Sequence, residues 1–149
     1  MLLRTLLVTL ATAFALQSPI ASAQVKVGVI TSSTGSTAMV GIPQNNTVPL
    51  LPQKAGEYIA LDDASVTNQT VTAFRKLISE HKIDALIGPT GSPHAINLIP
   101  FAAESGTPIL SPVGAAAVIL PMTPEKKWIF KTTQNDDIIG AALVKQVVD

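Results

Sequence analysis

Two hydroxyl groups and a glycine stand together at Thr90, Gly91 and Ser92, directly before Pro93. A serine followed by a proline is typical of a helix start, because serine caps free N–H groups and proline needs no hydrogen bond at the first helical position. The free N–H groups and the helix dipole favour a negative group beside them. The triplet therefore predicts a binding site for a carboxylate or a phosphate, which we call the anion seat. The alternative is an ordinary strand-to-helix turn without a ligand.

Asp62 and Asp63 are adjacent carboxylates at the end of an expected strand. Such pairs occur in metal sites and in acid–base catalysis, and more often they cap turns and helices. No third carboxylate or histidine follows at the spacing of metal ligands, so we interpret the pair as turn-forming and predict no metal and no cofactor. His81 is interpreted as a solvated cation at a helix end, and His94 as a residue on the rim of the predicted anion seat.

The sequence motifs of the common enzyme classes are missing. The chain has no G-x-G-x-x-G fingerprint and no Gly-Lys-Ser or Gly-Lys-Thr phosphate loop. It has no cysteine, which excludes thiol catalysis and cysteine-based metal sites. Neither histidine follows a strand end, where the base of a Ser-His-Asp arrangement would lie. We therefore predict no catalytic residues and no enzyme, with an enzyme on a Rossmann-like sheet as the less favoured alternative.

Regular elements must hold these residues in place. Short apolar runs bounded by turn residues predict strands at 25–30, 57–61, 85–87, 109–111 and 128–132. Apolar residues at helical spacing predict helices at 67–81, at 93–104 with a kink or a loosened last turn at Pro100, and from Asp136 or Asp137 onward. Residues 31–41 are expected to form a loop, and three prolines leave room for at most a short helix at 45–51.

Strands and helices alternate along the chain, which predicts the α/β class: a parallel sheet with helices on both faces. In such sheets ligands bind beyond the carboxyl ends of the strands. The loops at 32–41, 89–92 and 111–116 all leave those ends. We therefore expect them to converge on one crevice, with the triplet from Thr90 to Ser92 inside it.

Residues 1–23 are typical of a secretory signal peptide. Arg4 supplies the charge, Leu6 to Leu16 is an apolar stretch too short to span a bilayer, and Ala21 to Ala23 forms an A-x-A site, so we expect cleavage after Ala23 and a periplasmic location. Residues 24–149 then form one modest domain. Without Arg4 the chain has 9 basic residues against 10 acidic ones, and this balance argues against a nucleic-acid partner.

Five stretches in order carry a family resemblance: Lys26 to Ile30 with Thr34 and Gly35, Leu61 to Ser65, Arg75 to Ile78, Asp84 to Pro89, and Gly106 to Pro112. Together they resemble the periplasmic solute-binding proteins of ABC transporters, in the branched-chain amino-acid (leucine/isoleucine/valine-type) family. The resemblance implies two α/β lobes that close on a ligand and then dock on a membrane permease. It implies an amino acid, an amide or a small aromatic or aliphatic carboxylate as the ligand, and no catalysis.

The resemblance also implies a set of ligand-binding residues. The family holds the ligand's carboxylate with hydroxyl and backbone N–H groups of the first lobe, which match Thr90, Gly91 and Ser92. A second contact follows the Ser-Pro turn and matches Val113 and Ala115, where amino-acid binders often carry threonine in place of Ala115. Ser36, in the first loop, is included in the same predicted site.

The sequence matches only the first lobe of that family. It ends at Asp149, within what resembles a helix of that lobe, so residues 24–149 are expected to be an incomplete N-terminal lobe. We expect one lobe to bind weakly, because good small-molecule pockets bury roughly 70–90% of a ligand. A fragment and a one-lobe protein remain alternatives, as do an importer component and a ligand-sensing module.

Overall fold

The computed structural model describes residues 24–148. The predicted signal peptide, residues 1–23, lies outside the described residues, so the expected cleavage after Ala23 stays a prediction. In the described part of the chain, no helix combines the length and the apolar content needed to cross a membrane.

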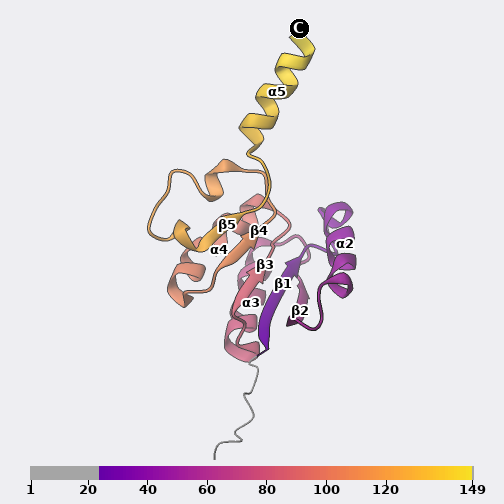
Figure 1. Cartoon of the computed structure of the whole chain (residues 1–149), viewed down its shortest axis with the longest axis vertical. Coiled ribbons are helices and arrows are strands. Elements are labelled where there is room, and N and C mark those ends of the chain that lie inside the picture. The colour runs from indigo at the N-terminus through magenta and orange to yellow at the C-terminus, as the bar shows by residue number, and fades with distance from the viewer. Residues whose placement is uncertain (1–23, 149) are drawn as a thin grey trace, which may run out of the picture.

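The centre of the fold is a parallel sheet of five strands in the order β2-β1-β3-β4-β5 (Figure 1). β1 pairs with β2 along its whole length and with β3 from Val27 to Val29. All five strands occur where the apolar runs predict them, and the α/β class is confirmed. Their bounds are Val25–Thr31 (β1), Gly56–Asp62 (β2), Ala85–Ile87 (β3), Ile109–Ser111 (β4) and Ile129–Lys131 (β5).

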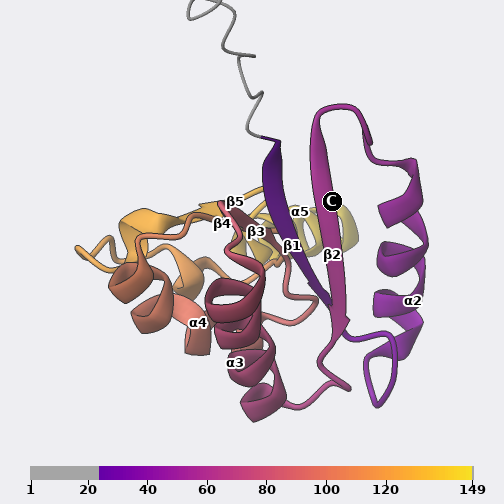
Figure 2. The same ribbon diagram turned by 90° about the horizontal axis from the view of Figure 1, so that it is seen from below.

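Helices cover both faces of this sheet. The chain runs from β1 to β2 at one edge of the sheet, then returns past β1 to β3 and continues to β4. Because crossovers between parallel strands are right-handed, this change of direction places the first helix on one face of the sheet and the next two helices on the other face. Figure 2 shows α2 on one side of β1 and β2, with α3 and α4 on the other side. The helices are α2 (Ala38–Thr47), α3 (Thr67–Lys76), which continues as the π-helical turn η2 (Leu77–His81), α4 (Ser92–Ser105) and α5 (Asp136–Val148).

The core lies between the sheet and the layer of α3 and α4. Phe74, Leu77 and Leu98 from this layer are fully buried against Ile30 and Leu86 of the sheet. They follow the helical and strand periods that the sequence shows, so α3 and α4 are held in place mainly by apolar burial. Short 3-10 turns complete the fold: η1 (Val48–Leu50), η3 (Ala116–Val118) and η4 (Lys126–Trp128).

Helix α2 starts earlier than the sequence indicates. Residues 38–41, which were expected in a loop, are helical, and the short helix expected at 45–51 is the end of α2 followed by η1. Gly41 is buried against the carbonyl group of Ser32, where a Cβ would overlap that group. Pro43 lies inside α2 and removes only one helical N–H. Tertiary contact at Gly41 therefore outweighs the local effect of the proline.

Helix α4 is continuous through Pro100. The kink or loosened turn expected at that position does not end the helix, which runs to Ser105 and stops at Gly106 in the left-handed conformation. Buried side chains recur on one side of α4 both before and after the proline, at Ala95, Leu98, Ile99 and Ala102. Packing on the sheet thus holds α4 together where one backbone hydrogen bond is lost.

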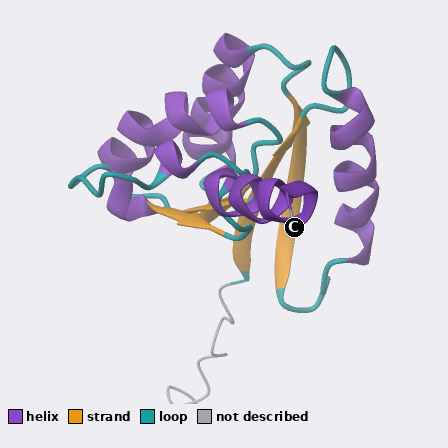
Figure 3. Cartoon of the chain, turned by 90° about the horizontal axis from the view of Figure 1, so that it is seen from above, coloured by secondary structure: helices purple, strands orange, loops and turns teal. Residues whose placement is uncertain are grey.

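Helix α5 projects away from the rest of the described chain (Figure 1); in Figure 3, seen from above, it lies in front of the sheet at the end marked C. It has no buried residue, although most of its side chains are apolar. Apolar side chains are also exposed on the sheet, where Leu110 of β4 and Phe130 of β5 are 41% and 54% exposed on the face opposite α3 and α4.

A candidate anion-binding crevice

The carboxyl ends of β1 and β3 lie side by side, and the chain leaves them in opposite directions, β1 toward β2 and β3 toward β4. Such a switch point creates a crevice between the two departing loops. Here the loops are linked across the switch point: the N–H of Ser32 donates to Oγ1 of Thr90 at 2.9 Å, and that hydroxyl donates to Oε1 of Gln44 at 2.7 Å. Thr90 therefore links the loop after β1 to α2, and its hydroxyl proton is already donated within the protein.

Ser92 does not cap α4 in the way that the sequence predicts. The cap residue is Gly91, in an extended conformation, Ser92 is the first helical residue, and no side chain caps the helix. The Ser92 Oγ instead accepts a hydrogen bond from the N–H of Ala115 at 3.3 Å. The physical reason is tertiary: the loop after β4 offers Ser92 a donor that competes with the local cap. The first N–H groups of α4 remain without a side-chain partner as a result.

The loop after β4 reaches the crevice with its backbone. The Val113 side chain is 3% exposed and belongs to the core, and its carbonyl oxygen accepts from the Thr133 hydroxyl at 2.7 Å. Ala115 is half-buried, and its N–H lies at Ser92. Of this predicted pair, then, Ala115 is joined to the triplet, whereas the Val113 side chain points into the protein.

Ser36 lies apart from these contacts. It is exposed in the turn before α2, and its side chain makes no hydrogen bond within the described residues. Its neighbours are fastened to the end of β2: the Thr34 hydroxyl donates to Asp62 at 2.6 Å, and the N–H of Thr37 donates to the Ser65 hydroxyl at 3.0 Å. The structure thus fixes the loop around Ser36 and shows no hydrogen bond between Ser36 and Ser92, so a ligand contact at Ser36 stays a prediction.

Asp62 closes the turn at the end of β2, as the sequence indicates for the paired aspartates. Partial burial acts to raise the pKa of Asp62, but hydrogen bonds from the Thr34 hydroxyl and from the N–H groups of Ala64, Thr34 and Ser33 lower it below its ordinary value of 3.8. Ala64 and Ser65 both have positive φ, at 50° and 60°. The carboxylate therefore holds a sharp turn that its own residues would not favour alone.

Asp63 is fully buried and serves several elements. Its carboxylate accepts from the hydroxyls of Ser32 at 2.7 Å and Thr70 at 2.8 Å, and from the N–H of Ser65 at 3.0 Å. The fourth neighbour is His94, whose Nδ1 lies 3.3 Å from Oδ2. The interpretation of Asp63 as a structural residue is confirmed, and its three donors come from the loop after β1, the turn after β2 and α3.

His94 was expected on the rim of the site, and this expectation is wrong. His94 is 6% exposed and lies beneath the crevice against Asp63. The sequence did contain the signal, because His94 precedes Leu98 by four positions and therefore lies on the buried side of α4. A polar side chain usually indicates an exposed position, and the buried partner of His94 is Asp63, 31 positions away in the chain. A local sequence pattern does not contain such a pair.

The crevice shows no catalytic arrangement among the described residues. The Ser32 hydroxyl donates to Asp63 and not to a histidine, so it does not form the serine–histidine pair of a nucleophilic site. No group of three or more metal-ligating side chains occurs within residues 24–148. What the crevice offers is the uncapped start of α4, the Ser92 hydroxyl and the backbone beside them, which is chemistry suited to an anion.

The sequence profile of the periplasmic binding proteins matches residues 24–149. The chain belongs to the periplasmic binding protein family. An extracellular ligand-binding receptor from Rhodopseudomonas palustris HaA2 is 38% identical, with a TM-score of 0.81 over 85% of this chain and 36% of the receptor. No curated protein matches the chain.

Two further solved structures extend the comparison. A solute-binding protein of an ABC transporter from Rhodopseudomonas palustris BisB5, in complex with 3,4-dihydroxybenzoic acid, is 26% identical, with a TM-score of 0.66 over 75% of this chain and 32% of that protein. A leucine-binding protein from Thermotoga maritima shares the fold at 24% identity and a TM-score of 0.71, over 80% of this chain and 35% of its own. This periplasmic binding protein chain thus spans about a third of the length of these structures.

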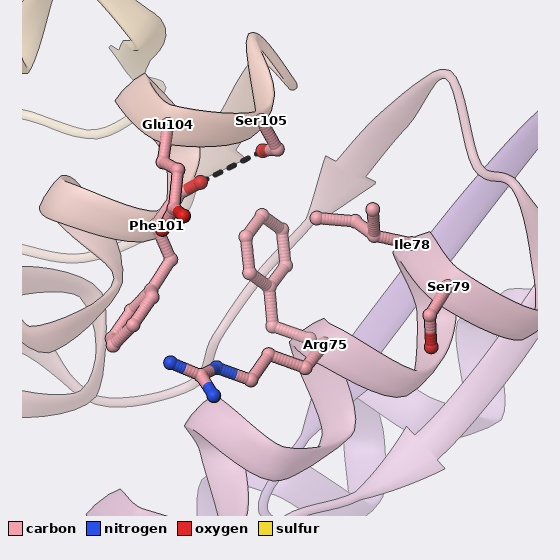
Figure 4. Close-up of a pocket in the computed structure, with 7 residues that line it drawn as sticks. Arg75, Ile78, Ser79, Phe101, Glu104 and Ser105 are labelled. Carbon is pink, nitrogen blue, oxygen red and sulfur yellow. Dashed lines mark hydrogen bonds between the residues drawn. The ribbon is translucent and has the colours of Figure 1, made fainter.

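A hollow of this periplasmic binding protein chain, shown in Figure 4, lies between α3 and α4 and not at the crevice. It measures about 550 Å³ and opens between the ends of α3 and α4, where the Arg75 guanidinium lies 4.8 Å from the ring centroid of Phe101. Both helices end there, just before β3 and β4 begin, so this hollow is at the amino edge of the sheet. A smaller apolar hollow of about 210 Å³ lies under α2 beside Gln44 and Gly88.

Proposed function

We propose that the crevice binds the carboxylate of an amino acid or of a small aromatic or aliphatic acid, as the first-lobe half of a solute-binding site. The observation that carries the proposal is the contact between Ser92 and Ala115 at the uncapped start of α4. It joins the two segments that resemble the family's carboxylate contacts. The 3,4-dihydroxybenzoate complex of a 26% identical relative supports an acid as the ligand class.

The geometry at Ser92 leaves a donor for the ligand. Because the Ser92 oxygen accepts from Ala115, its own proton is free to point toward a bound oxygen. The first N–H groups of α4 add further neutral donors, and the helix dipole favours negative charge there. A hydrogen bond to a charged group contributes about 1.5–3 kcal/mol. The carboxylate is therefore held by oriented dipoles, with no basic side chain needed in this half of the site.

The proposed role is that of the solute-binding component of an ABC importer in the periplasm. Its partners are the small-molecule ligand and a membrane permease, which receives the ligand after the two lobes close. The resemblance to ABC solute-binding proteins supports this role. A second lobe would supply the contacts to the rest of the ligand, so we propose that binding by residues 24–149 alone is weak.

The test is an NMR titration of the ¹⁵N-labelled protein, which detects weak binding. Leucine, benzamide and 3,4-dihydroxybenzoate are added in turn, and the amide signals of Thr90 to Ser92 and of Ala115 are followed. Ser92→Ala is expected to weaken binding of the best acid roughly 10- to 150-fold. Ser105→Ala is the matched control, because this exposed hydroxyl at the far end of α4 donates to the Phe101 carbonyl.

The same variants separate binding from stability. Because Ser92 does not cap α4, Ser92→Ala is expected to lower affinity without the loss of about 1 kcal/mol that removing a cap causes. Equal affinity of the parent and Ser92→Ala for the best acid would overturn the role of this hydroxyl. If benzamide bound best, the argument from the helix start would fail as well.

A further inference from the structure

We infer that Asp63 and His94 form a positioning pair, in which the Nδ1 proton of His94 is donated to Asp63 and fixes the start of α4 relative to β1 and β2. The pair touches no ligand. Its effect on affinity rests on the proposed function, because the start of α4 is the proposed anion seat.

The first argument is convergence on one carboxylate. Asp63 is fully buried, and its oxygens face Ser32 at the end of β1, Ser65 in the turn after β2, Thr70 in α3 and His94 in α4. A buried carboxylate is costly unless donors surround it. Each of these elements therefore has one preferred position relative to the others, set by its donor's distance to Asp63.

The second argument concerns the proton on the imidazole. Nδ1 of His94 is buried, forms no hydrogen bond within the described chain, and lies 3.3 Å from Oδ2 of Asp63. An ionised carboxylate only accepts hydrogen bonds, so a bare Nδ1 would set two lone pairs against each other. A proton on Nδ1 removes that repulsion. The contact thus favours the tautomer that carries a proton on Nδ1, and that proton would make His94 the fourth donor to Asp63.

The third argument links the pair to the anion seat. The His94 ring lies against Gly91, such that a Cβ on Gly91 would be 3.2 Å from Nδ1 and 3.5 Å from Cε1. Gly91 is the cap residue of α4 and the middle residue of the predicted triplet. The ring is therefore wedged between the buried carboxylate and the seat. If the His94 ring tilts or is removed, Gly91 and the N–H groups at the start of α4 are no longer held in one position.

The tautomer is tested first, by long-range ¹H–¹⁵N NMR of the imidazole rings. The Nδ1 of His94 is expected to give a protonated-type signal, and this signal is expected to change in Asp63→Asn. The half-buried His81 serves as the internal reference ring. An unprotonated-type Nδ1 signal for His94 in the parent protein would overturn the inference, whatever the ligand.

Positioning is tested with a pair of variants at one site. His94→Leu removes the donor, whereas His94→Asn keeps an N–H near the place of Nδ1. We expect His94→Leu to shift the amide signals of Gly91 and Ser92 and to weaken carboxylate binding about 3- to 10-fold, and His94→Asn to restore most of both. His81→Leu is the matched control and should leave Gly91 and Ser92 unchanged.

The outcomes distinguish this inference from the proposed function. Equal behaviour of His94→Leu and His94→Asn would overturn the positioning role. If the parent protein bound none of the acids, the proposed function would fail, and the ring signal with the Gly91 and Ser92 amide shifts would still decide for or against the pair. If His94→Leu did not fold, the tautomer and the amide shifts of His94→Asn would decide it.

Discussion

Helices α3 and α5 differ in what their apolar side chains touch. α3 is mostly polar, yet Thr70 and Phe74 are fully buried between the sheet and α4. α5 is mostly apolar, yet Leu143 is 62% and Val147 is 85% exposed. The apolar residues of α3 lie on one side at helical spacing, whereas those of α5 occur all around the helix.

The difference shows that burial is set by topology as well as by composition. α3 connects β2 to β3 and must cross the sheet, so its single apolar side meets the strands. α5 follows β5, the last strand in the sheet order, and no later strand draws it back onto the sheet within the described residues. We therefore expect substitutions in these two helices to have very different effects.

The largest effect is expected at Phe74. Phe74→Ala removes a fully buried ring from the core and should lower the free energy of unfolding by about 3–5 kcal/mol. Leu143→Ala in α5 is the matched control, with an expected change within about 0.5 kcal/mol. Urea unfolding followed by circular dichroism measures both. Similar losses for the two variants would contradict the comparison.

The next effect concerns the close contact of α2 with β1. A Cβ on Gly41 would overlap the Ser32 carbonyl, which is backbone and has little freedom to move. Gly41→Ala should therefore lower the free energy of unfolding by about 1–3 kcal/mol. This is a net loss, because the clash outweighs the gain of up to about 1 kcal/mol that alanine brings to a helix. The Ser32 and Thr90 amide signals should shift with it. A stabilised Gly41→Ala protein would show that α2 can move away from β1.

Most of the fold follows from local pattern. The five strands, α3, α4 and the start of α5 lie where apolar periodicity and Gly or Pro boundaries predict them, because those signals sit within a few residues. α2 was missed at residues 38–41 because its support is the contact between Gly41 and Ser32, which no local pattern contains.

The candidate site was predictable in place but not in detail. The switch point follows from the order of the elements, so Thr90 and Ser92 could be placed at the crevice. The hydrogen bonds of these residues could not be predicted, because Thr90 is bonded to Gln44 and Ser92 to Ala115, which are distant in the chain. The burial of His94 likewise depends on Asp63. Long-range polar pairs of this kind leave no periodic signal.

A smaller effect is expected from Asp62 and depends on pH. The pKa of Asp62 is lowered in the folded protein, so its carboxylate contributes stability above the ordinary value of 3.8, and that contribution is lost as pH falls through the lowered pKa. Asp62→Asn should destabilise the protein at neutral pH by less than about 1 kcal/mol, because the group is exposed and screened. The difference from the parent should shrink in urea titrations repeated at falling pH. A difference that grows toward acid would contradict the assigned hydrogen bonds.

The smallest effect on global unfolding is expected at Gly140, the counterpart of Gly41 in α5. A Cβ at Gly140 meets no atom within 4 Å, so Gly140→Ala adds no clash and gains the helix preference of alanine, about 0.5–1 kcal/mol within α5 itself. Because α5 has no buried residue, this gain should not reach the core. The expected result is a higher helical signal by circular dichroism with the urea midpoint unchanged. A urea midpoint that rises with the helical signal would show that α5 unfolds together with the sheet. In that case α5, like α3, would be part of the cooperative unfolding unit.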